Sequence, residues 1–526
     1  MSESKTHKPK TQIYYFSEDY EQVLKELPDV IDAAKRLASE VLEPTIHEKR
    51  EVMKIIREFI REKERKVYGG TALNEALKMI NPEDAIYDET IFSDIEFYSP
   101  TPAVDLVELT NILYHKGYKY IQGKEAQHDE TYSIFVNMQL YCDITYVPRN
   151  VYYGIRVLKI DGINYVHPHF MLIDYLRMIN DPMNAAEQRW EKAFKRIFKL
   201  LKNYPLEHIR RPLNLPRPSE EVETYLTKIR SSFLTMEDVR DTCLITGFSA
   251  YNFFVTHAMK RLGSTETGGS SKISEYIGSM LAIVPYFEFV SVSYVDTVVK
   301  LYNFIRGIVE DPKELSLEEY FPLFQFTNYS VVINYKNQPI AKVYEADGQC
   351  ITNIKIKYHG YRYVSYQYLL MSLLIFKFQA YLRGDELMYC NYRSAISNLV
   401  EVKNIYRKRL ELPVINDSIF GEFKISCVGT TISYTRMALL RKLERKKKGK
   451  RTQFVYEPEK FFALSEEEQK KFDPSKHLFR NTSGNMIRNP KNLKFRLDES
   501  GNIQKNVKEE ESYEERENNG NEVSPN

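Results

Sequence analysis

The stretch from Tyr68 to Tyr98, YGGTALNEALKMINPEDAIYDETIFSDIEFY, decides how the rest of the chain is organised. A Gly-Gly-Thr tripeptide leads into a predicted short helix, and a loop then leads to a predicted strand that carries Asp94 and Glu96. Side chains two positions apart on a strand point to the same side, so the two carboxylates project together. Carboxylates this close repel each other unless a cation lies between them, and hard oxygen ligands suit Mg2+ or Mn2+.

A third carboxylate fits the same site. The segment MQLYCDITYV (residues 138–147) alternates as a half-buried strand does and places Asp143 on the face opposite its apolar residues. On a strand beside the first, Asp143 would complete a three-carboxylate site for two metal ions. Such a site activates an attacking hydroxyl and neutralises a leaving pyrophosphate.

The glycine motif before these strands predicts a phosphate site. Gly69 and Gly70 allow the backbone to approach phosphate oxygens, and the helix start behind them adds N–H donors and a positive dipole end. We therefore expect Gly69, Gly70 and Thr71 to hold a triphosphate through backbone N–H groups and a hydroxyl. Each motif alone also fits an ordinary turn or a solvated strand face; the three in this order are far more specific.

Together these motifs resemble the DNA polymerase β-like nucleotidyltransferases. The forms YGGTALNE, SDIEFYSP and LYCDITYV are similar to the poly(A) polymerase catalytic subunits of large cytoplasmic DNA viruses, of the poxvirus, mimivirus and African swine fever virus type. The gap from Gly70 to Asp94 is longer than in most of the superfamily and fits the viral group. The resemblance implies an α/β (α+β) fold in which a mixed sheet with flanking helices forms a nucleotidyltransferase domain.

The resemblance also implies template-independent addition of AMP from ATP to the 3′ end of RNA. Asp94 and Glu96 would hold both metal ions, and Asp143 would complete the one that activates the 3′-hydroxyl. Arg149 and Lys159 are candidates for the positive charge on the phosphates. We expect an aromatic ring to stack on the adenine, although the sequence does not single out a tyrosine.

Three alternatives stay open at this point. The chain could have another nucleotide specificity, it could be an RNA-binding processivity subunit on the same fold, or it could be an unrelated structural protein. The resemblance offers both a homodimer and a viral processivity partner as assemblies. It implies the host cytoplasm, at viral factories, as the location, with packaging in the virion as an alternative.

A chain of 526 residues is too long for one core and predicts two to four domains. Helical periodicity, motifs and composition predict five regions: an N-terminal helical arm (1–50), a catalytic nucleotidyltransferase domain (51–215), a degenerate nucleotidyltransferase-like domain (219–410), a C-terminal extension with a basic run (411–500) and a disordered acidic tail (501–526). The proline-rich residues 204–218 read as a linker.

The degenerate domain is inferred from an internal repeat. FEFVSVSYVDTVVKLYNFI (287–305) echoes IEFYSPTPAVDLVELTNIL (95–113) at an offset of 192, and GGSSKISEY (268–276) echoes the glycine motif. At that offset Glu288 matches Glu96, but Tyr286 stands where Asp94 would be. We therefore expect a second domain of the same fold without a metal site.

The charge distribution and the cysteine pattern bear on the partner of the protein and on its environment. The net charge is +2, but the segment from Lys508 onward holds seven acids against two bases, which leaves a moderately basic body suited to a polyanion. The run RKLERKKKGKR (441–451) makes Lys446, Lys447 and Lys448 candidates for RNA contact. Five scattered cysteines predict neither a disulfide framework nor a zinc site, and no segment reads as a membrane span.

Overall fold

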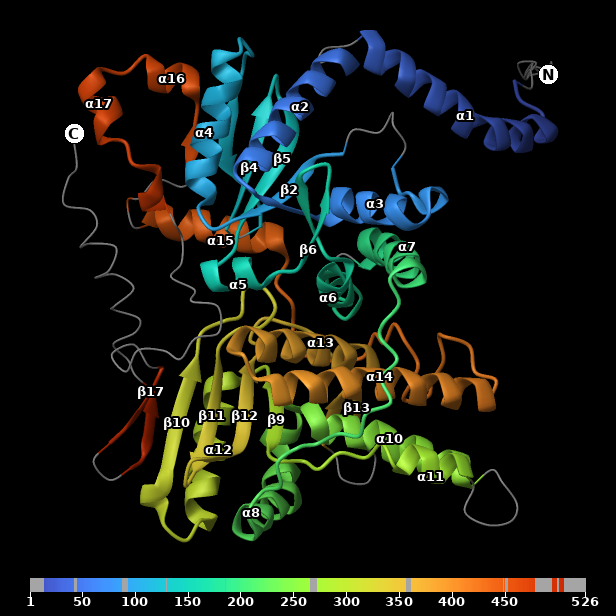
Figure 1. The fold of residues 1–526 in the computed structure, drawn as a ribbon, viewed down its shortest axis with the longest axis vertical. Helices are drawn as coiled ribbons and strands as arrows, with labels where there is room; N and C mark the ends of the chain where they lie inside the picture. Colours follow the sequence, from blue (N-terminus) through green and yellow to red (C-terminus); the bar gives the residue numbers. More distant parts are fainter. Residues whose placement is uncertain are drawn as a thin grey trace, which may run out of the picture.

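The computed structural model contains two domains stacked one above the other (Figure 1). It describes residues 14–41, 45–87, 93–128, 130–184, 186–264, 272–355, 361–447, 449, 453–477, 494–498 and 501–505. No helix in these ranges is long and apolar enough to cross a membrane.

The first domain is built on an eight-stranded mixed sheet with the order β16-β3-β4-β5-β2-β1-β7-β6. Its strands are β1 (Lys66–Tyr68), β2 (Ile95–Ser99), β3 (Gln122–Glu125), β4 (Thr131–Val136), β5 (Gln139–Tyr146), β6 (Val157–Ile160), β7 (Ile163–Val166) and β16 (Val455–Tyr456). Strand β2 runs antiparallel to β1 and parallel to β5, so the two predicted acidic strands are direct neighbours.

Helices cover this sheet. They are α1 (Ser17–Val41), α2 (Ile46–Glu62), α3 (Gly69–Ile80), α4 (Pro102–His115), α5 (Arg149–Gly154), α6 (Pro168–Ile179) and α7 (Ala186–Asn203). Helix α2 begins after the Thr45 cap and buries Phe59 against Phe97 of β2. The predicted boundary at residue 50 therefore falls inside a helix of the first domain, and only α1 extends as an exposed arm (Figure 1).

The second domain repeats this topology. Its sheet has the order β10-β11-β12-β9-β8-β14-β13-β15, which matches the first sheet strand for strand when the added edge strands are set aside. The strands are β8 (Cys243–Thr246), β9 (Phe287–Ser291), β10 (Leu315–Tyr320), β11 (Ser330–Tyr335), β12 (Gln338–Glu345), β13 (Ile351–Lys355), β14 (Arg362–Val364) and β15 (Cys427–Val428). The helices are α8 (Glu220–Ser231), α9 (Glu237–Arg240), α10 (Gly247–Gly263), α11 (Lys272–Gly278), α12 (Tyr294–Ile308), α13 (Tyr366–Arg383) and α14 (Glu386–Arg409).

The predicted internal repeat is confirmed by this topology, with one correction. The offset of 192 holds for β2 and α4, which correspond to β9 and α12. It does not hold for the glycine motif, because the turn between β8 and α10 corresponds to the one between β1 and α3, and its glycine is Gly247. The GGSS sequence used in the prediction begins at residues 268–271, which lie outside the described residues.

The C-terminal extension belongs to both domains. Strand β16 extends the first sheet beside β3, and β15 extends the second beside β13. The other elements are α15 (Tyr434–Lys447), α16 (Pro458–Phe462), α17 (Glu466–Lys471), β17 (Phe495–Leu497) and β18 (Ile503–Lys505). Because β17 and β18 form a hairpin whose Phe495 and Ile503 enter the second core, the predicted disordered tail is wrong for residues 501–505. Residues 506–526 lie outside the described ones.

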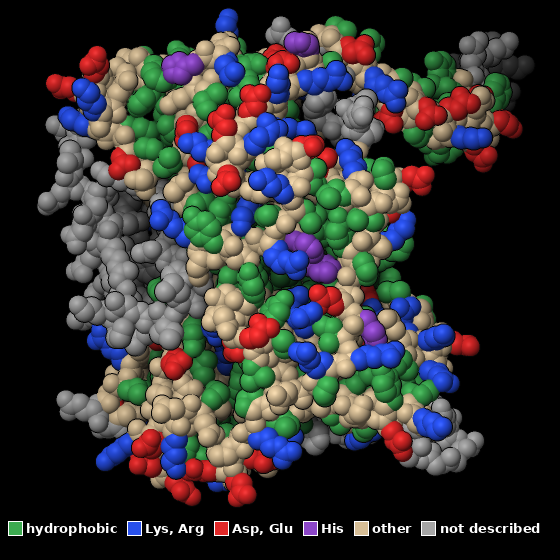
Figure 2. All heavy atoms as spheres, viewed as in Figure 1, with side chains coloured by type: hydrophobic (Ala, Val, Ile, Leu, Met, Phe, Trp, Pro, Cys, Tyr) green, Lys and Arg blue, Asp and Glu red, His purple; other side chains and the backbone are tan. Residues whose placement is uncertain are grey.

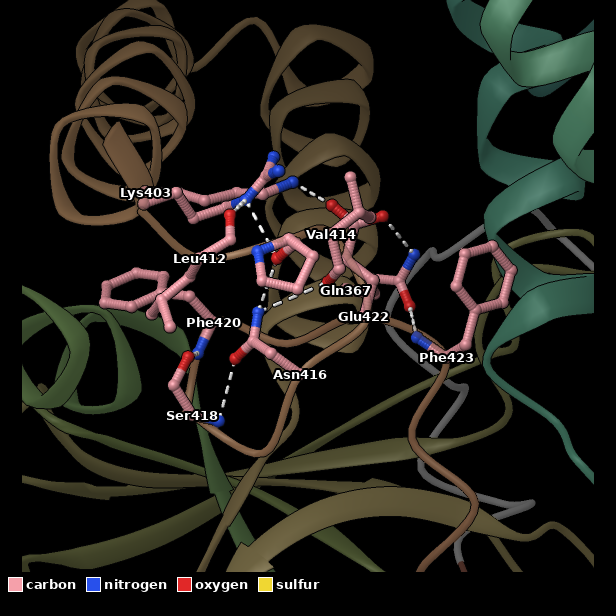
Figure 3. A network of polar contacts seen from close by, with 11 residues as sticks. Gln367, Lys403, Leu412, Val414, Asn416, Ser418, Phe420, Glu422 and Phe423 are labelled. Carbon is pink, nitrogen blue, oxygen red and sulfur yellow. Dashed lines mark hydrogen bonds and ion pairs between the residues drawn. The ribbon is translucent and has the colours of Figure 1, made fainter. Parts of the chain in front are cut away.

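The segment 410–431 straps the two domains together (Figure 3). Glu422 forms an ion pair with Lys403 of α14 and accepts a hydrogen bond of 3.0 Å from Gln367 of α13. The next residue, Phe423, packs its ring 5.6 Å from that of Trp190 on α7. The strap therefore fixes α7 of the first domain to α13 and α14 of the second.

A disulfide anchors the same strap, contrary to the expectation from the cysteine pattern. Cys350 and Cys427 are bonded, with their Cα atoms 5.5 Å apart, within the usual range for a disulfide. The pairing of β13 with β15 brings them together across 77 residues of sequence, which spacing alone could not reveal. The other three cysteines are free.

Candidate active site

The three predicted carboxylates meet on one face of the first sheet. In the parallel pairing of β2 with β5, Glu96 lies directly beside Asp143, and Asp94 stands two residues before Glu96. Paired residues on neighbouring strands project to the same side. Ile95 and Cys142 point to the opposite, buried face, as the alternation predicted.

Each carboxylate is held by a neighbouring donor. The Glu96 Oε2 atom accepts the Gly70 N–H at 3.3 Å, Asp143 Oδ1 accepts the Ser133 hydroxyl at 2.6 Å, and Asp94 Oδ1 accepts the Ser93 hydroxyl at 3.3 Å. In the described part of the chain, no three His, Cys, Asp or Glu side chains are gathered closely enough to ligate a metal ion. The three carboxylates are therefore adjacent but do not converge on one point.

The electrostatics of this face favour a cation. Burial, followed by the charges of Asp94 and Asp143, raises the pKa of Glu96 to about 7, while the Gly70 N–H and Arg196 oppose the shift. Burial also raises the pKa of Asp143, against the Ser133 hydroxyl and together with the charge of Asp94. Oxygen ligands that repel one another in a desolvated place fit a hard divalent ion such as Mg2+ or Mn2+.

The glycine turn is shaped by its contact with Glu96. Gly69 has a φ of +71°, and a Cβ added there would lie 1.8 Å from Glu96 Oε2. A Cβ on Gly70 would lie 2.2 Å from the Tyr87 hydroxyl oxygen. Thr71 donates its hydroxyl to the Asp94 carbonyl at 3.3 Å, so it ties the acidic loop to the helix start. Neither glycine can be replaced without moving the site.

Arg196 supplies the positive charge beside this turn. Its Nη2 atom donates to the Tyr87 hydroxyl at 2.8 Å and would lie 2.9 Å from a Cβ on Gly70. The sequence motifs did not single out this arginine. The missed signal is its position on α7, because Arg196 shares a helical stripe with the buried residues Ala193, Ile197 and Leu200.

The two basic candidates named from the sequence are not brought to the turn. Arg149 opens α5 with an exposed side chain, and Lys159 is exposed on β6, which β1 and β7 separate from β2. In the described residues neither makes a hydrogen bond or ion pair with the carboxylates or the glycine turn.

The basic run of the extension lies at the other edge of the first sheet. Arg445 pairs with Glu125 of β3 at 2.8 Å, and Lys446 and Lys447 at the end of α15 are exposed. Lys448 lies outside the described residues. RNA contact by these lysines stays a prediction.

An aromatic layer continues the catalytic face toward the second domain. The rings of Tyr68 and Tyr98 are stacked 3.9 Å apart, and Tyr98 also meets Phe324 of the second domain edge to face at 5.5 Å. Phe324 lies in the loop between β10 and β11. The second domain therefore contributes directly to the surroundings of the carboxylate face.

The corresponding place in the second domain is filled by its own side chains. Gly247 has a φ of +61°, and a Cβ there would lie 1.8 Å from Glu288 Oε2, which repeats the contact between Gly69 and Glu96. The register of β9 and β12, however, pairs Glu288 with Lys342. The Lys342 ammonium lies 4.6 Å from the centre of the Tyr344 ring. The predicted loss of the paired-carboxylate site is confirmed.

Comparisons with known proteins match both domains. A family model described as "Poly(A) polymerase catalytic subunit" matches residues 54–185, and one described as "APMV, Putative poly(A) polymerase, catalytic subunit, C-terminal" matches residues 220–497. The chain is 53% identical over 524 residues to the "Putative poly(A) polymerase catalytic subunit" of Acanthamoeba polyphaga mimivirus, which covers 97% of this chain and 90% of that protein.

More distant relatives and a solved structure agree. A protein of the same name from African swine fever virus (isolate Warthog/Namibia/Wart80/1980) is 28% identical over 184 residues, 34% of this chain and 38% of that one. The crystal structure of the Megavirus polyadenylate synthase superposes with a TM-score of 0.89 at 56% identity, covering 96% of this chain and 98% of that chain. These names are those of a catalytic subunit and a synthase, and they favour the enzyme over the processivity-subunit alternative.

Proposed function

The chain belongs to the poly(A) polymerase catalytic subunits of large DNA viruses, enzymes that add poly(A), and on this premise we propose how its carboxylate face performs the reaction. Asp94, Glu96 and Asp143 would hold two Mg2+ or Mn2+ ions. When bound, such ions activate the 3′-hydroxyl of RNA and neutralise the pyrophosphate that leaves ATP. The observation that carries this proposal is the register that places Glu96 beside Asp143 next to the glycine turn.

The protein's own groups orient the nucleotide. The Gly70 N–H that now bonds Glu96 is the donor that we assign to a phosphate oxygen of ATP, together with the start of α3. Arg196, whose guanidinium lies against Gly70, would neutralise the same phosphates; it replaces Arg149 and Lys159 as our leading candidate. Holding the α-phosphate in line with the 3′-hydroxyl supplies the orientation that the reaction requires.

A matched pair of substitutions tests the assignment. Glu96→Gln and Glu288→Gln remove corresponding carboxylates, each beside the glycine turn of its own domain. Purified variants would be incubated with a labelled RNA primer, Mg2+ or Mn2+, and each nucleoside triphosphate in turn. We expect an ATP-dependent ladder for the native protein and for Glu288→Gln, and none for Glu96→Gln. A ladder from Glu96→Gln would remove the site assignment, and addition of CTP would overturn the substrate.

Assembly and location complete the proposal. The term "catalytic subunit" in the relative's name suggests a partner subunit, and we keep both a homodimer and a viral processivity partner as candidates. Light scattering of the purified chain, alone and with RNA, separates these states. For location we retain the host cytoplasm at viral factories, with packaging in the virion as the alternative, to be tested by imaging and by analysis of purified particles.

A further inference from the structure

The linker between the two domains is pinned to helix α14 at two points. The Ile209 N–H donates to the Ser397 hydroxyl at 2.8 Å. Further along, the Asn214 N–H donates to Asn391 Oδ1 at 2.7 Å, and Asn391 Nδ2 donates back to the Asn214 carbonyl at 2.8 Å. Ser397 and Asn391 are both buried. The linker backbone between the pins therefore follows a fixed path along α14.

A small cavity lies between these pins. Its volume is about 140 Å³, and it is lined by Ile209, Arg211, Cys390, Arg393 and Ser394, which we call the linker pocket. At ~30 Å³ for each water molecule, this is room for about four or five waters. The pocket is thus large enough for a phosphate group, and its lining offers no aromatic ring on which a base could stack.

The charges around the linker pocket are unbalanced. Within the described residues, the one hydrogen bond of the Arg211 guanidinium goes to Cys390 Sγ at 3.7 Å, and sulfur is a weak acceptor. Arg393 already shares the carboxylate of Glu207, with contacts of 2.8 and 2.7 Å. The Cys390 thiol in turn donates to the exposed Glu386 carboxylate at 3.4 Å. Among the described residues, Glu207 is thus the carboxylate that contacts a guanidinium group of the pocket directly, and it contacts Arg393.

A lysine from the second domain adds to this excess. Burial lowers the pKa of Lys377 on α13; Glu207 raises it, whereas Arg393 and Arg156 lower it again. In the described chain Lys377 has no ion pair. Cations that repel one another are stabilised by an anion, and a guanidinium fork matches the oxygens of phosphate.

We propose that the linker pocket binds a backbone phosphate of RNA, upstream of the 3′ end that is being extended. This inference rests on the proposed function, which supplies RNA as the substrate. Further bases continue the surface: Arg217 on the linker and Lys408 near the end of α14 are exposed. On the face drawn in Figure 2, several Lys, Arg and His side chains lie across the middle of the molecule, among acidic and hydrophobic ones.

The test compares two neighbouring arginines of the linker. Arg211→Gln removes the charge in the pocket, whereas Arg210→Gln removes the same charge from a side chain that bonds His208 outside it. Affinity for a long labelled poly(A) and for a short primer would be measured between 50 and 200 mM salt. A slope of ≈ −0.7 per phosphate contact predicts that the loss of affinity for long RNA over this range is about 2.6-fold smaller in Arg211→Gln. Arg210→Gln should keep more of the native slope.

Further readouts separate this inference from the catalytic proposal. Arg211→Gln should extend the short primer by one AMP at the native rate but release long RNA sooner, giving shorter tails. Arg211→Lys keeps the charge and should restore the salt slope. A native slope in Arg211→Gln, or an increased KM for ATP with unchanged RNA affinity, would overturn the pocket as an RNA site. Failure of the native protein to extend any primer would instead count against the proposed function.

Discussion

Arg196→Gln is the substitution that tests the triphosphate site most directly. The guanidinium lies against Gly70 and donates to the Tyr87 hydroxyl at 2.8 Å. It also opposes the rise in the pKa of Glu96. Glutamine keeps a polar side chain but loses the charge, so the effect on ATP isolates the electrostatic contribution.

The expected size follows from the strength of a charged contact. A hydrogen bond to a charged group contributes about 1.5–3 kcal/mol, and each 1.4 kcal/mol is a factor of ten. Loss of one phosphate contact therefore predicts a decrease of roughly 10- to 150-fold in kcat/KM for ATP. The KM for RNA should change little, because Arg196 is assigned to the nucleotide.

The matched control is the preceding residue. Lys195 is exposed and pairs with Glu191 on the outer side of the same helix, so Lys195→Gln removes one charge without touching the turn. Initial rates would be measured at saturating primer and varied ATP, with thermal melting as a check on folding. Equal effects of the two substitutions, or a loss below about threefold for Arg196→Gln in a folded protein, would refute the triphosphate role.

Three more predictions concern the same architecture. The pKa of Glu96 is raised to about 7, above its usual 4.5, so between these pH values the folded protein binds a proton that the unfolded chain has lost. Without metal, the free energy of unfolding should therefore fall by on the order of 3 kcal/mol as the pH rises from 4.5 to 7. Added Mg2+ should restore the melting temperature at pH 8 but not at pH 5. Gly69→Ala should abolish nucleotide addition, since its Cβ would meet Glu96, whereas Gly117→Ala, also at positive φ but in open space, should leave the activity intact in the same primer assay. Cys427→Ser opens a loop of 77 residues and should lower the stability of the oxidised protein by about 4 kcal/mol in denaturant titrations, a difference that reductant should erase.

The catalytic face was readable from the sequence because its geometry is local. Residues alternate along a strand, so Asp94 and Glu96 had to share a face, and the pattern around Asp143 predicted a second strand of the same kind. That the two strands are neighbours came from the resemblance and is confirmed by the register of β2 and β5. The metal-binding roles of these residues stay predictions.

The proposed phosphate contacts were harder to predict because they join residues that lie far apart in the sequence. Arg196 lies 126 residues after Gly70, and only the packing of α7 beside α3 brings it there. Gly247 was missed for another reason: the sequence TGFSAYN at the start of α10 contains no Gly-Gly motif. The short strands β15 and β16 are too short to show an alternation of apolar and polar residues. They form because each pairs with the open edge of a sheet, β15 with β13 and β16 with β3.

The two domains share one backbone arrangement but place side chains of opposite charge beside the corresponding glutamates. In the first, Glu96 has Asp143 beside it and Asp94 two residues before it, so the charges of these two aspartates raise the pKa of Glu96 and the face favours an added cation. In the second, the same register gives Glu288 a lysine neighbour, and burial raises the pKa of the acid while it lowers that of the base.

A site that carries its own cation has no need of a metal ion, and the Lys342 ammonium also lies over the Tyr344 ring. The second domain could lose its chemistry without losing its fold, because the glycine turn and its glutamate stayed while the neighbouring charge changed sign. It keeps a structural role: Phe324 packs on the aromatic layer beside Glu96 and Asp143, and α13 and α14 hold the segment 410–431 that fixes α7. The second domain holds α7 in place, and α7 carries Arg196. Substitutions that destabilise the second domain should therefore first lower the affinity of the first domain for ATP.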